Sequence, residues 1–467
     1  MANARIVPFC DIRDVRFGHP DLPLRCGSVT IRVVGLTATE RLRHGARYVK
    51  YVLAAICGCF AWVHSAAGVA ATIYRLTTIP GQNHVLAVSV NRSYPFYKTT
   101  LALRGVASGL VESQVENPVC DGKPLKGQAR RGIWHVPAGC RHISWKIALG
   151  DVSTDDAAGQ RSVAFASGHS FLISESSSLP RLEQTSAPEM LLLPPELSRE
   201  TFPRARPDGT IALPPKSQPP LLLLIGAKPV AVRASSTVSI RYFIDVPKNL
   251  NRVPTIDSVM RGLQWLTGLI RPRDAMGFNY LWLGRAASSG SVGGATGGDL
   301  LLVNYLRTGT NHPLAADVTR ATPFIEATHE ISRLYGPKPA WVEESLAMYL
   351  GLQALGHANP HDPTSHLLLQ HFRTAAHQFP MGLIAVQHQV SDGDVSHYAA
   401  FFTKGVAFWA AVNREMQIRR DGSLSSHLKV IWTAKYGHAG RPPPDFGTAL
   451  GLPETSWKRL EDAYLRG

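Results

Sequence analysis

Cysteine is scarce over most of this 467-residue chain. Four of the six cysteines lie close to the N-terminus: Cys10, Cys26, Cys57 and Cys59. Only Cys120 and Cys140 occur in the remaining sequence. In an oxidising compartment these two would be expected to pair, whereas in reduced form they would be ordinary small buried residues. The sequence leaves both states open.

Several signatures of known enzyme and binding classes are also missing. No G-x-S-x-G elbow occurs, and the glycine-rich segment 290 to 298 lacks the G-K-[ST] needed to cradle a phosphate. Segment 168 to 178 contains several serines, but its alternating pattern is typical of a strand and a turn. The net charge is +15, yet the basic residues are scattered and no nucleic-acid motif appears. No nucleic-acid partner is therefore expected.

The composition is that of a folded protein with more than one structural unit. Hydrophobic residues make up 45% of the chain and charged residues 18%, so substantial cores can be buried. The length exceeds that of one usual domain, and no repeat of fixed period is visible. Two or three structural units are expected.

Residues 47 to 71, RYVKYVLAAICGCFAWVHSAAGVAA, are typical of a signal peptide. Arg47 and Lys50 precede an apolar core, and small residues suitable for cleavage follow. The core of about a dozen residues is short for a membrane span, although an uncleaved anchor is an alternative. Residues 1 to 46 are an unusual extension ahead of a signal peptide, and we expect that Met1 is not the true start. The protein is expected to be periplasmic or secreted, and to contact a membrane only if the segment stays uncleaved.

The hydrophobic periodicity predicts an α+β protein with two main domains. Between residues 72 and 246 the apolar residues alternate, as in Leu86, Val88 and Val90, which predicts an N-terminal antiparallel β domain. The proline-rich segment 186 to 220 is interpreted as a surface excursion or linker within or beside this β domain. After Pro254 the apolar spacing becomes helical, so residues 247 to 467 are predicted to form a mostly helical domain.

The stretch 327 to 351, ATHEISRLYGPKPAWVEESLAMYLG, carries the strongest chemical signal. His329 and Glu330 begin an H-E-x-x-H pattern, in which two histidines on one helical face bind zinc and the glutamate activates water. Arg333 stands where the second histidine should be. We expect this helix to start with Thr322 as N-cap and Pro323 at its first position.

A second helix is predicted over the W-V-E-E-S-L-A-M-Y-L-G part of the stretch. Glu344 shares a helical face there with Ala347, Met348 and Gly351. A carboxylate on such a small, apolar face needs a partner, because a buried unpaired charge is costly.

Together these motifs resemble those of the gluzincin metallopeptidases, in particular the glycyl aminopeptidase branch. The W-x-x-E-S-x-A-x-Y spacing after H-E-x-x-R resembles the family's second helix, and F-T-K-G at 402 to 405 resembles its Y-x-K-G motif. Segment 291 to 306, SVGGATGGDLLLVNYL, takes the place of the family's substrate-edge strand, with Gly293 and Gly294 as candidate substrate-binding residues. The resemblance implies a thermolysin-like catalytic domain behind the β domain, a peptide or protein substrate, and zinc as cofactor if the site is active.

The resemblance also implies roles for individual residues. His329 matches the first zinc ligand, Glu330 the general base and Glu344 the third ligand. Three positions depart from the family pattern: Arg333 replaces the second ligand, Phe402 the oxyanion-stabilising tyrosine, and Thr296 approximately the glutamate that holds the substrate amino terminus. Tyr398 is a candidate to supply the lost hydroxyl, or else a partly buried core tyrosine.

We expect that the zinc site is degenerate and that little or no peptidase activity remains, because Arg333 has no lone pair to donate to a metal. In our hypothesis Arg333 takes the metal's place and bridges Glu330 and Glu344. The alternatives are an active zinc aminopeptidase with a substitute ligand and an envelope structural or interaction module. Candidate substitute ligands are the downstream histidines: His357, His361, His366, His371, His377, His388 and His397.

Overall fold

The computed structural model describes most of the chain after residue 70. The described residues are 71–91, 96–104, 113–152, 161–165, 170–183, 187–216, 218–272, 274–285, 293–307, 313–419 and 422–466. Residues 69–467 belong to one compact unit. The expected extension and nearly all of the expected signal segment lie outside the described residues. Within the described ranges, no helix combines the length and apolarity that a membrane crossing requires.

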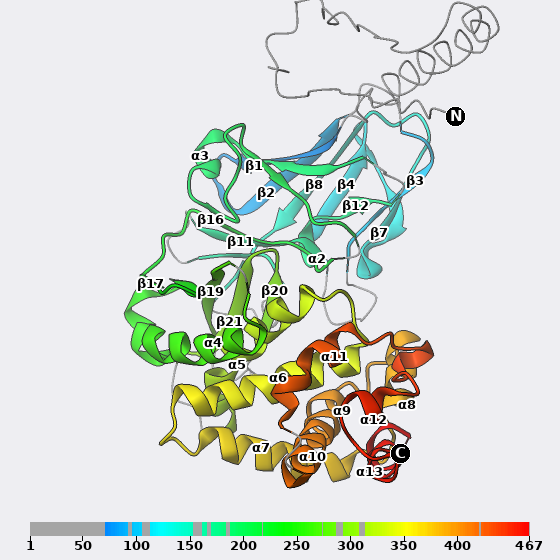
Figure 1. Ribbon diagram of the computed structural model, residues 1–467. Helices are drawn as coiled ribbons and strands as arrows, with labels where there is room; N and C mark the ends of the chain where they lie inside the picture. The colour runs from blue at the N-terminus through cyan, green and yellow to red at the C-terminus, as the bar shows by residue number, and fades with distance from the viewer. Residues whose placement is uncertain are drawn as a thin grey trace, which may run out of the picture. The chain divides into compact units, whose positions relative to one another are not determined.

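The N-terminal half consists almost entirely of strands (Figure 1). They are β1 (Thr72–Ile79), β2 (Gln82–Asn91), β3 (Thr99–Ala102), β4 (Val115–Cys120), β5 (Lys123–Pro124), β6 (Lys126–Gln128), β7 (Ile133–Val136), β8 (His142–Ala148), β9 (Gly150–Asp151), β10 (Val163–Ala164), β11 (Phe171–Ser174), β12 (Arg181–Leu182), β13 (Glu189–Leu192), β14 (Thr201–Phe202), β15 (Thr210–Ala212) and β16 (Leu222–Ile225). Three short helical turns interrupt them: η3 (Ala129–Arg131), α2 (Glu175–Ser178) and α3 (Pro195–Ser198).

These strands form three sheets, ordered β15-β13-β1-β2-β8-β4-β5, β14-β16-β11-β10-β9 and β12-β3-β7-β6. Most pairs are antiparallel, with β1 and β13, and β9 and β10, as parallel pairs. The alternation seen in the sequence sets the register of β2, where Val88 lies opposite Trp145 and both side chains are buried. The predicted β domain is therefore confirmed.

The proline-rich segment lies within this β domain, as expected, but it forms paired strands with buried residues rather than a surface excursion or linker. β13 pairs with both β1 and β15, and Leu191 and Ile211 are buried in the core. The prolines lie between short strands rather than within a flexible connection. Strands this short carry too little alternation to be recognised among so many prolines.

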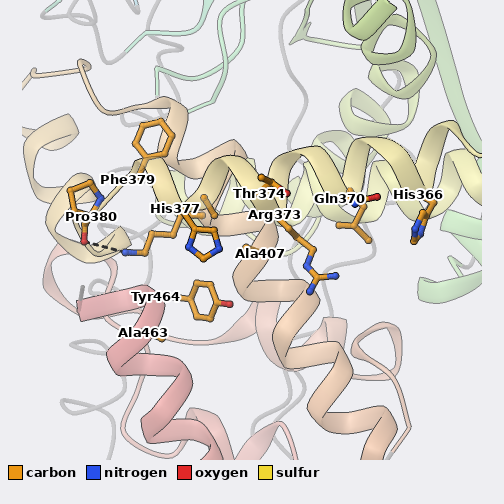
Figure 2. Close-up of a pocket in the computed structure, with 13 residues that line it drawn as sticks. His366, Gln370, Arg373, Thr374, His377, Phe379, Pro380, Ala407, Ala463 and Tyr464 are labelled. Carbon is orange, nitrogen blue, oxygen red and sulfur yellow. Dashed lines mark hydrogen bonds between the residues drawn. The ribbon is translucent and has the colours of Figure 1, made fainter.

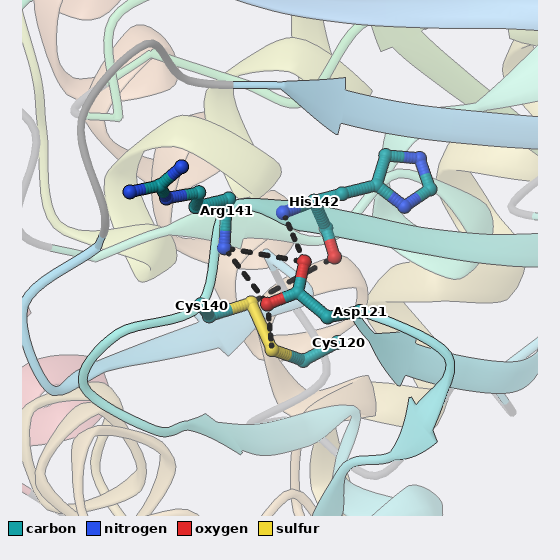
Figure 3. The surroundings of a disulfide bond; sticks show 5 residues. All are labelled: Cys120, Asp121, Cys140, Arg141 and His142. Carbon is teal, nitrogen blue, oxygen red and sulfur yellow. Dashed lines mark hydrogen bonds between the residues drawn. A yellow bond between two sulfur atoms is a disulfide. The ribbon is translucent and has the colours of Figure 1, made fainter.

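Cys120 and Cys140 form a disulfide that joins the end of β4 to the residues before β8 (Figure 3). Beside it, the Asp121 carboxylate accepts hydrogen bonds from the backbone N–H groups of Arg141 and His142. Of the two cysteine states that the sequence leaves open, the structure has the oxidised one.

The C-terminal half contains a five-stranded sheet and most of the helices (Figure 1). Its elements are β17 (Ala231–Ala234), β18 (Val238–Ile244), η4 (Pro247–Arg252), α4 (Ile256–Ile270), β19 (Met276–Arg285), β20 (Gly294–Gly297), β21 (Leu300–Leu306), α5 (Pro313–Arg333), α6 (Ala340–Ala358), α7 (Thr364–Ala375), η6 (Ala376–Gln378), α8 (Leu383–Ser391), α9 (Ala399–Phe402), α10 (Lys404–Arg419), η7 (Leu424–His427), α11 (Leu428–Thr433), η8 (His438–Gly440), α12 (Phe446–Ala449), α13 (Glu454–Leu460) and η9 (Glu461–Arg466). The predicted α+β class is confirmed.

The sheet of this half has the order β17-β18-β19-β21-β20, with parallel pairing between β18, β19 and β21. Its central strands are buried on both faces, as parallel sheets usually are. Tyr280 and Trp282 face the helical core, whereas Leu281 and Leu283 pack with Leu224 and other residues of the β domain. β17 and β18 belong to this sheet, although the sequence-based boundary at residue 246 lay after them.

Helix α5 begins at Pro313, well before the predicted start, and Pro323 lies inside it. The expectation that Pro323 opens the helix was wrong. An internal proline removes one backbone hydrogen bond and costs about 3 kcal/mol. Burial of Phe324 and Ala327 in the core offsets this cost, and the Tyr280 hydroxyl donates a hydrogen bond to the Pro323 carbonyl at 2.9 Å.

Lys404 and Gly405, at the start of α10, hold this helix against neighbouring segments. Lys404 Nζ donates hydrogen bonds to the carbonyls of Met381 (2.9 Å) and Pro380 (3.3 Å). Gly405 packs against α6 so closely that an added Cβ would lie 2.3 Å from Ser345 Cβ. A glycine is therefore required at this contact.

Gly405→Ala should destabilise the protein by about 1–3 kcal/mol, because the added methyl group overpacks the contact between α10 and α6. Gly268→Ala is the matched control, since Gly268 lies in helix α4 with nothing within 4 Å of its added Cβ. The control should be neutral or stabilise by up to about 1 kcal/mol through helix propensity. Urea unfolding measures both, and equal free energies of unfolding would contradict the role of Gly405.

Candidate functional site

Helices α5 and α6 bring the motif residues together. α5 presents His329, Glu330 and Arg333, while α6 presents Glu343 and Glu344. The two helices approach closely at Gly351, where an added Cβ would lie 2.5 Å from Ile325 Cγ1. This contact lets the polar residues of both helices meet.

His329 lies between two carboxylates of α6. Its Nε2 is 3.5 Å from Glu344 Oε2, and its Nδ1 is 3.7 Å from Glu343 Oε1. Burial alone would lower the pKa of His329, but the adjacent carboxylates, Glu344 above all, raise it well above its usual value. The two carboxylates therefore favour the protonated form of the imidazole.

Glu344 has a second partner on a distant segment. The Tyr398 hydroxyl donates a hydrogen bond to Glu344 Oε1 at 2.7 Å. The Tyr398 ring packs against Phe402, with ring centroids 5.7 Å apart. Burial, followed by the charge of Glu344, raises the pKa of Tyr398, so the phenol stays protonated and donates. The structure thus places the candidate hydroxyl of Tyr398 at the site and Phe402 beside it.

Arg333 contacts Glu330 but not Glu344, the two carboxylates that it was expected to bridge. Its Nη1 lies 2.8 Å from Glu330 Oε2, so these two residues form an ion pair along α5. Among the described residues Arg333 has no such contact with Glu344, whose oxygens face His329 and Tyr398 instead. Burial raises the pKa of Glu330, and the charge of Arg333 opposes this rise. The carboxylate expected to act as general base is therefore paired with a permanent cation.

Glu326 is a site residue that sequence reasoning missed. It is only 7% exposed, lies on α5 one turn before His329, and accepts a hydrogen bond from the Thr296 hydroxyl of β20. An added Cβ on Gly294 would lie 2.4 Å from Glu326 Oε1, so this glycine makes room for the carboxylate. Burial raises the pKa of Glu326 above its usual value. The helical spacing of three residues to His329 was the signal that could have identified it.

Glu343 was also missed, although it is adjacent to Glu344 in sequence. Burial alone would raise its pKa, but the adjacent His329 and the charges of Lys338 and Arg333 together outweigh burial, and the net pKa is lowered. Lys338 also contributes to this lowering, while its own ammonium donates to the Ser332 carbonyl at 2.6 Å. The site therefore contains more carboxylates than the motif alone suggested.

These residues do not fit a catalytic zinc ion. Such a site needs three protein ligands and an open position, whereas of the three positions that the sequence resemblance assigns to ligands only His329 and Glu344 carry one. In the described part of the chain, the one group of three His, Cys, Asp or Glu ligand atoms within 4.8 Å of one another is Cys120, Asp121 and Cys140, whose sulfurs are in the disulfide. Arg333 adds a positive charge at the missing ligand position, where it would repel a metal.

The downstream histidines do not supply the missing ligand within the described residues. His357 stacks on Trp265, with ring centroids 4.4 Å apart. His388 lies beside Asp392, with Nδ1 2.9 Å from Oδ2. His397 contacts the hydroxyl of its neighbour Ser396. The remaining candidates, His361, His366, His371 and His377, are all exposed.

The arrangement of two domains matches that of solved peptidases. An aminopeptidase N family protein from Idiomarina loihiensis superposes with a TM-score of 0.56 and 14% identity, over 84% of this chain and 73% of that chain. The chain has an aminopeptidase fold. A mutant M1 zinc metallopeptidase from Deinococcus radiodurans, bound to a Tyr-Ser-Ala substrate, gives a TM-score of 0.46 and 13% identity over 86% and 94%. No family model and no curated protein matches the sequence.

Arg333→Ala should destabilise the protein by about 1–2 kcal/mol, because it leaves the partly buried Glu330 carboxylate unpaired. Arg459→Ala is the control, since Arg459 is 63% exposed in its ion pair with Glu415. The control should change stability by less than about 1 kcal/mol. Denaturant unfolding of both variants tests the role of Arg333. Equal decreases in the free energy of unfolding would refute it.

Proposed function

We propose that this protein is an exported aminopeptidase-like protein that binds peptides and has lost zinc-dependent hydrolysis. The observation that carries the proposal is the ion pair of Arg333 with Glu330. Arg333 stands at a position where a metal ligand would be needed and cannot serve as one. The same side chain pairs with Glu330, the carboxylate that would activate water. Export is supported by the segment 47 to 71 and by the Cys120–Cys140 disulfide, since disulfides persist in oxidising compartments.

Peptide binding is supported by strand β20, which lies at an edge of its sheet. An extended peptide can add to such an edge through backbone hydrogen bonds. The far end of β20 is covered, since an added Cβ on Gly297 would meet the Pro220 carbonyl at 2.4 Å. Gly293, by contrast, faces open space. A peptide would therefore bind along the Gly293 and Gly294 end of the strand.

The charges of the site favour a peptide with a free amino terminus. The carboxylates are Glu326, Glu330, Glu343 and Glu344. They face Arg333, Lys338 and His329. Glu326 lies directly behind Gly294, where it could accept a hydrogen bond from the amino group of a peptide on β20.

Purified wild-type protein should contain no stoichiometric zinc after zinc loading and dialysis, whereas Arg333→His should bind one zinc ion. The substitution supplies the third ligand and removes the repelling charge. Elemental analysis measures the metal content, and Arg333→Gln controls for loss of charge without gain of a ligand. Stoichiometric zinc in the wild type that disappears in His329→Ala would refute the proposal in favour of an active enzyme.

Short peptides with a free amino terminus should bind, and N-acetylation should weaken their binding by about tenfold because it removes a charge-assisted hydrogen bond. Gly294→Ala should weaken binding to a similar extent, since the new methyl group displaces Glu326. Gly268→Ala, in helix α4 outside the proposed peptide site, is the control and should bind normally. Titration calorimetry with trialanine and its acetylated form tests this, and equal binding by both peptides would exclude amine recognition.

A further inference from the structure

The guanidinium group of Arg333 has hydrogen-bond donors that the protein leaves unused. Its Nη1 donates to Glu330 Oε2 at 2.8 Å. Its Nε is buried without a hydrogen-bond partner, and among the described residues no partner contacts its Nη2. A guanidinium carries five N–H donors in a rigid fork. Since 23% of the Arg333 side chain is exposed, a ligand in the aminopeptidase-like site formed by α5 and α6 can reach it and accept from Nη2.

Glu326 and Arg333 lie on the same face of α5, two helical turns apart. Along the helix axis this spacing is about 10 Å. Glu326 is buried behind Gly294, whereas Arg333 is partly exposed. Burial raises the pKa of Glu326, and the charges of His329 and Arg333 oppose this rise. The aminopeptidase-like site thus presents an acid and a cation at a fixed spacing.

A short peptide with both ends free carries the complementary charges. Its amino group is a cation that can donate to Glu326, and its terminal carboxylate is an anion that can accept from Arg333. A carboxylate accepts stronger hydrogen bonds from a guanidinium than a neutral peptide carbonyl does. Three extended residues span at most about 10 Å, which matches the spacing of the two side chains along α5.

We propose that the aminopeptidase-like site binds di- and tripeptides with both ends free, holding the amino group at Glu326 and the terminal carboxylate at Arg333. The inference rests on the proposed function, because it concerns a peptide in the same site. Arg333 stands at the position that the sequence resemblance assigns to a metal ligand, and there it provides a cation that binds a carboxylate. The site is therefore selective for small peptides rather than for the amino terminus of a protein.

Titration calorimetry of the full protein with trialanine and trialanine amide tests this assignment. Wild type should bind the amide about tenfold more weakly, because amidation removes the charge-assisted hydrogen bond with Arg333. In Arg333→Gln the two peptides should bind equally, whereas Arg333→Lys should keep part of the preference because it keeps the positive charge. The ratio of the two affinities is measured within each folded variant, so a lower stability of the variant does not change it.

Arg373→Gln is the matched control. Arg373 is an exposed arginine of α7 that lines a separate cavity together with Tyr464 (Figure 2). Its loss changes the net charge as Arg333→Gln does, so the wild-type preference for trialanine should remain. Equal binding of trialanine and its amide by wild type would overturn the inference and leave the proposed function intact. If neither peptide binds, both fail.

Hexaalanine provides a second measurement, which concerns peptide length. Six extended residues span about 20 Å, roughly twice the spacing of Glu326 and Arg333 along α5. With its amino group at Glu326, this peptide places its carboxylate beyond Arg333. Wild type should therefore bind hexaalanine about tenfold more weakly than trialanine, and Arg333→Gln should bind both equally. Equal affinity of the wild type for the two peptides would also overturn the inference.

Discussion

The close packing of α5 against α6 is the constraint on which the aminopeptidase-like site depends. Gly351 of α6 lies so near Ile325 of α5 that no larger side chain fits. Trp341 fixes α6 from its other side, donating to the Gly440 carbonyl at 2.9 Å and stacking on Trp409. With both helices held in this way, His329 must lie against Glu344, whatever the chemistry of the site.

The basic groups that pair with Glu330 and Glu344 are side chains of the protein itself, Arg333 and His329. A zinc ion can be lost to a chelator, but Arg333 is covalently part of α5 and stays protonated. It compensates Glu330 at 2.8 Å, while Glu344 is compensated by His329 and by the Tyr398 hydroxyl. The Glu330 and Glu344 carboxylates thus each have a partner that the chain itself supplies.

The sequence predicted those parts of the structure that depend on local spacing. The distance from Trp341 to Glu344 is fixed by helix geometry, so the meeting of His329 and Glu344 followed from the motif. Glu326 was missed because its partner Thr296 lies on a distant strand, a contact that only the tertiary fold creates. The start of α5 was placed too late for a related reason: propensity favours Pro323 at a helix start, but core packing overrides it.

The segment from Phe402 to Gly405 is held in place by three different contacts. Phe402 packs on Tyr398, which holds Glu344. Gly405 packs on Ser345, whose hydroxyl accepts from Trp409 at 2.7 Å. Lys404, between them, donates hydrogen bonds to the carbonyls of Met381 and Pro380. Because Phe402 at the end of α9 and Gly405 at the start of α10 are both fixed, Lys404 is held in its buried position by the same packing that supports Glu344.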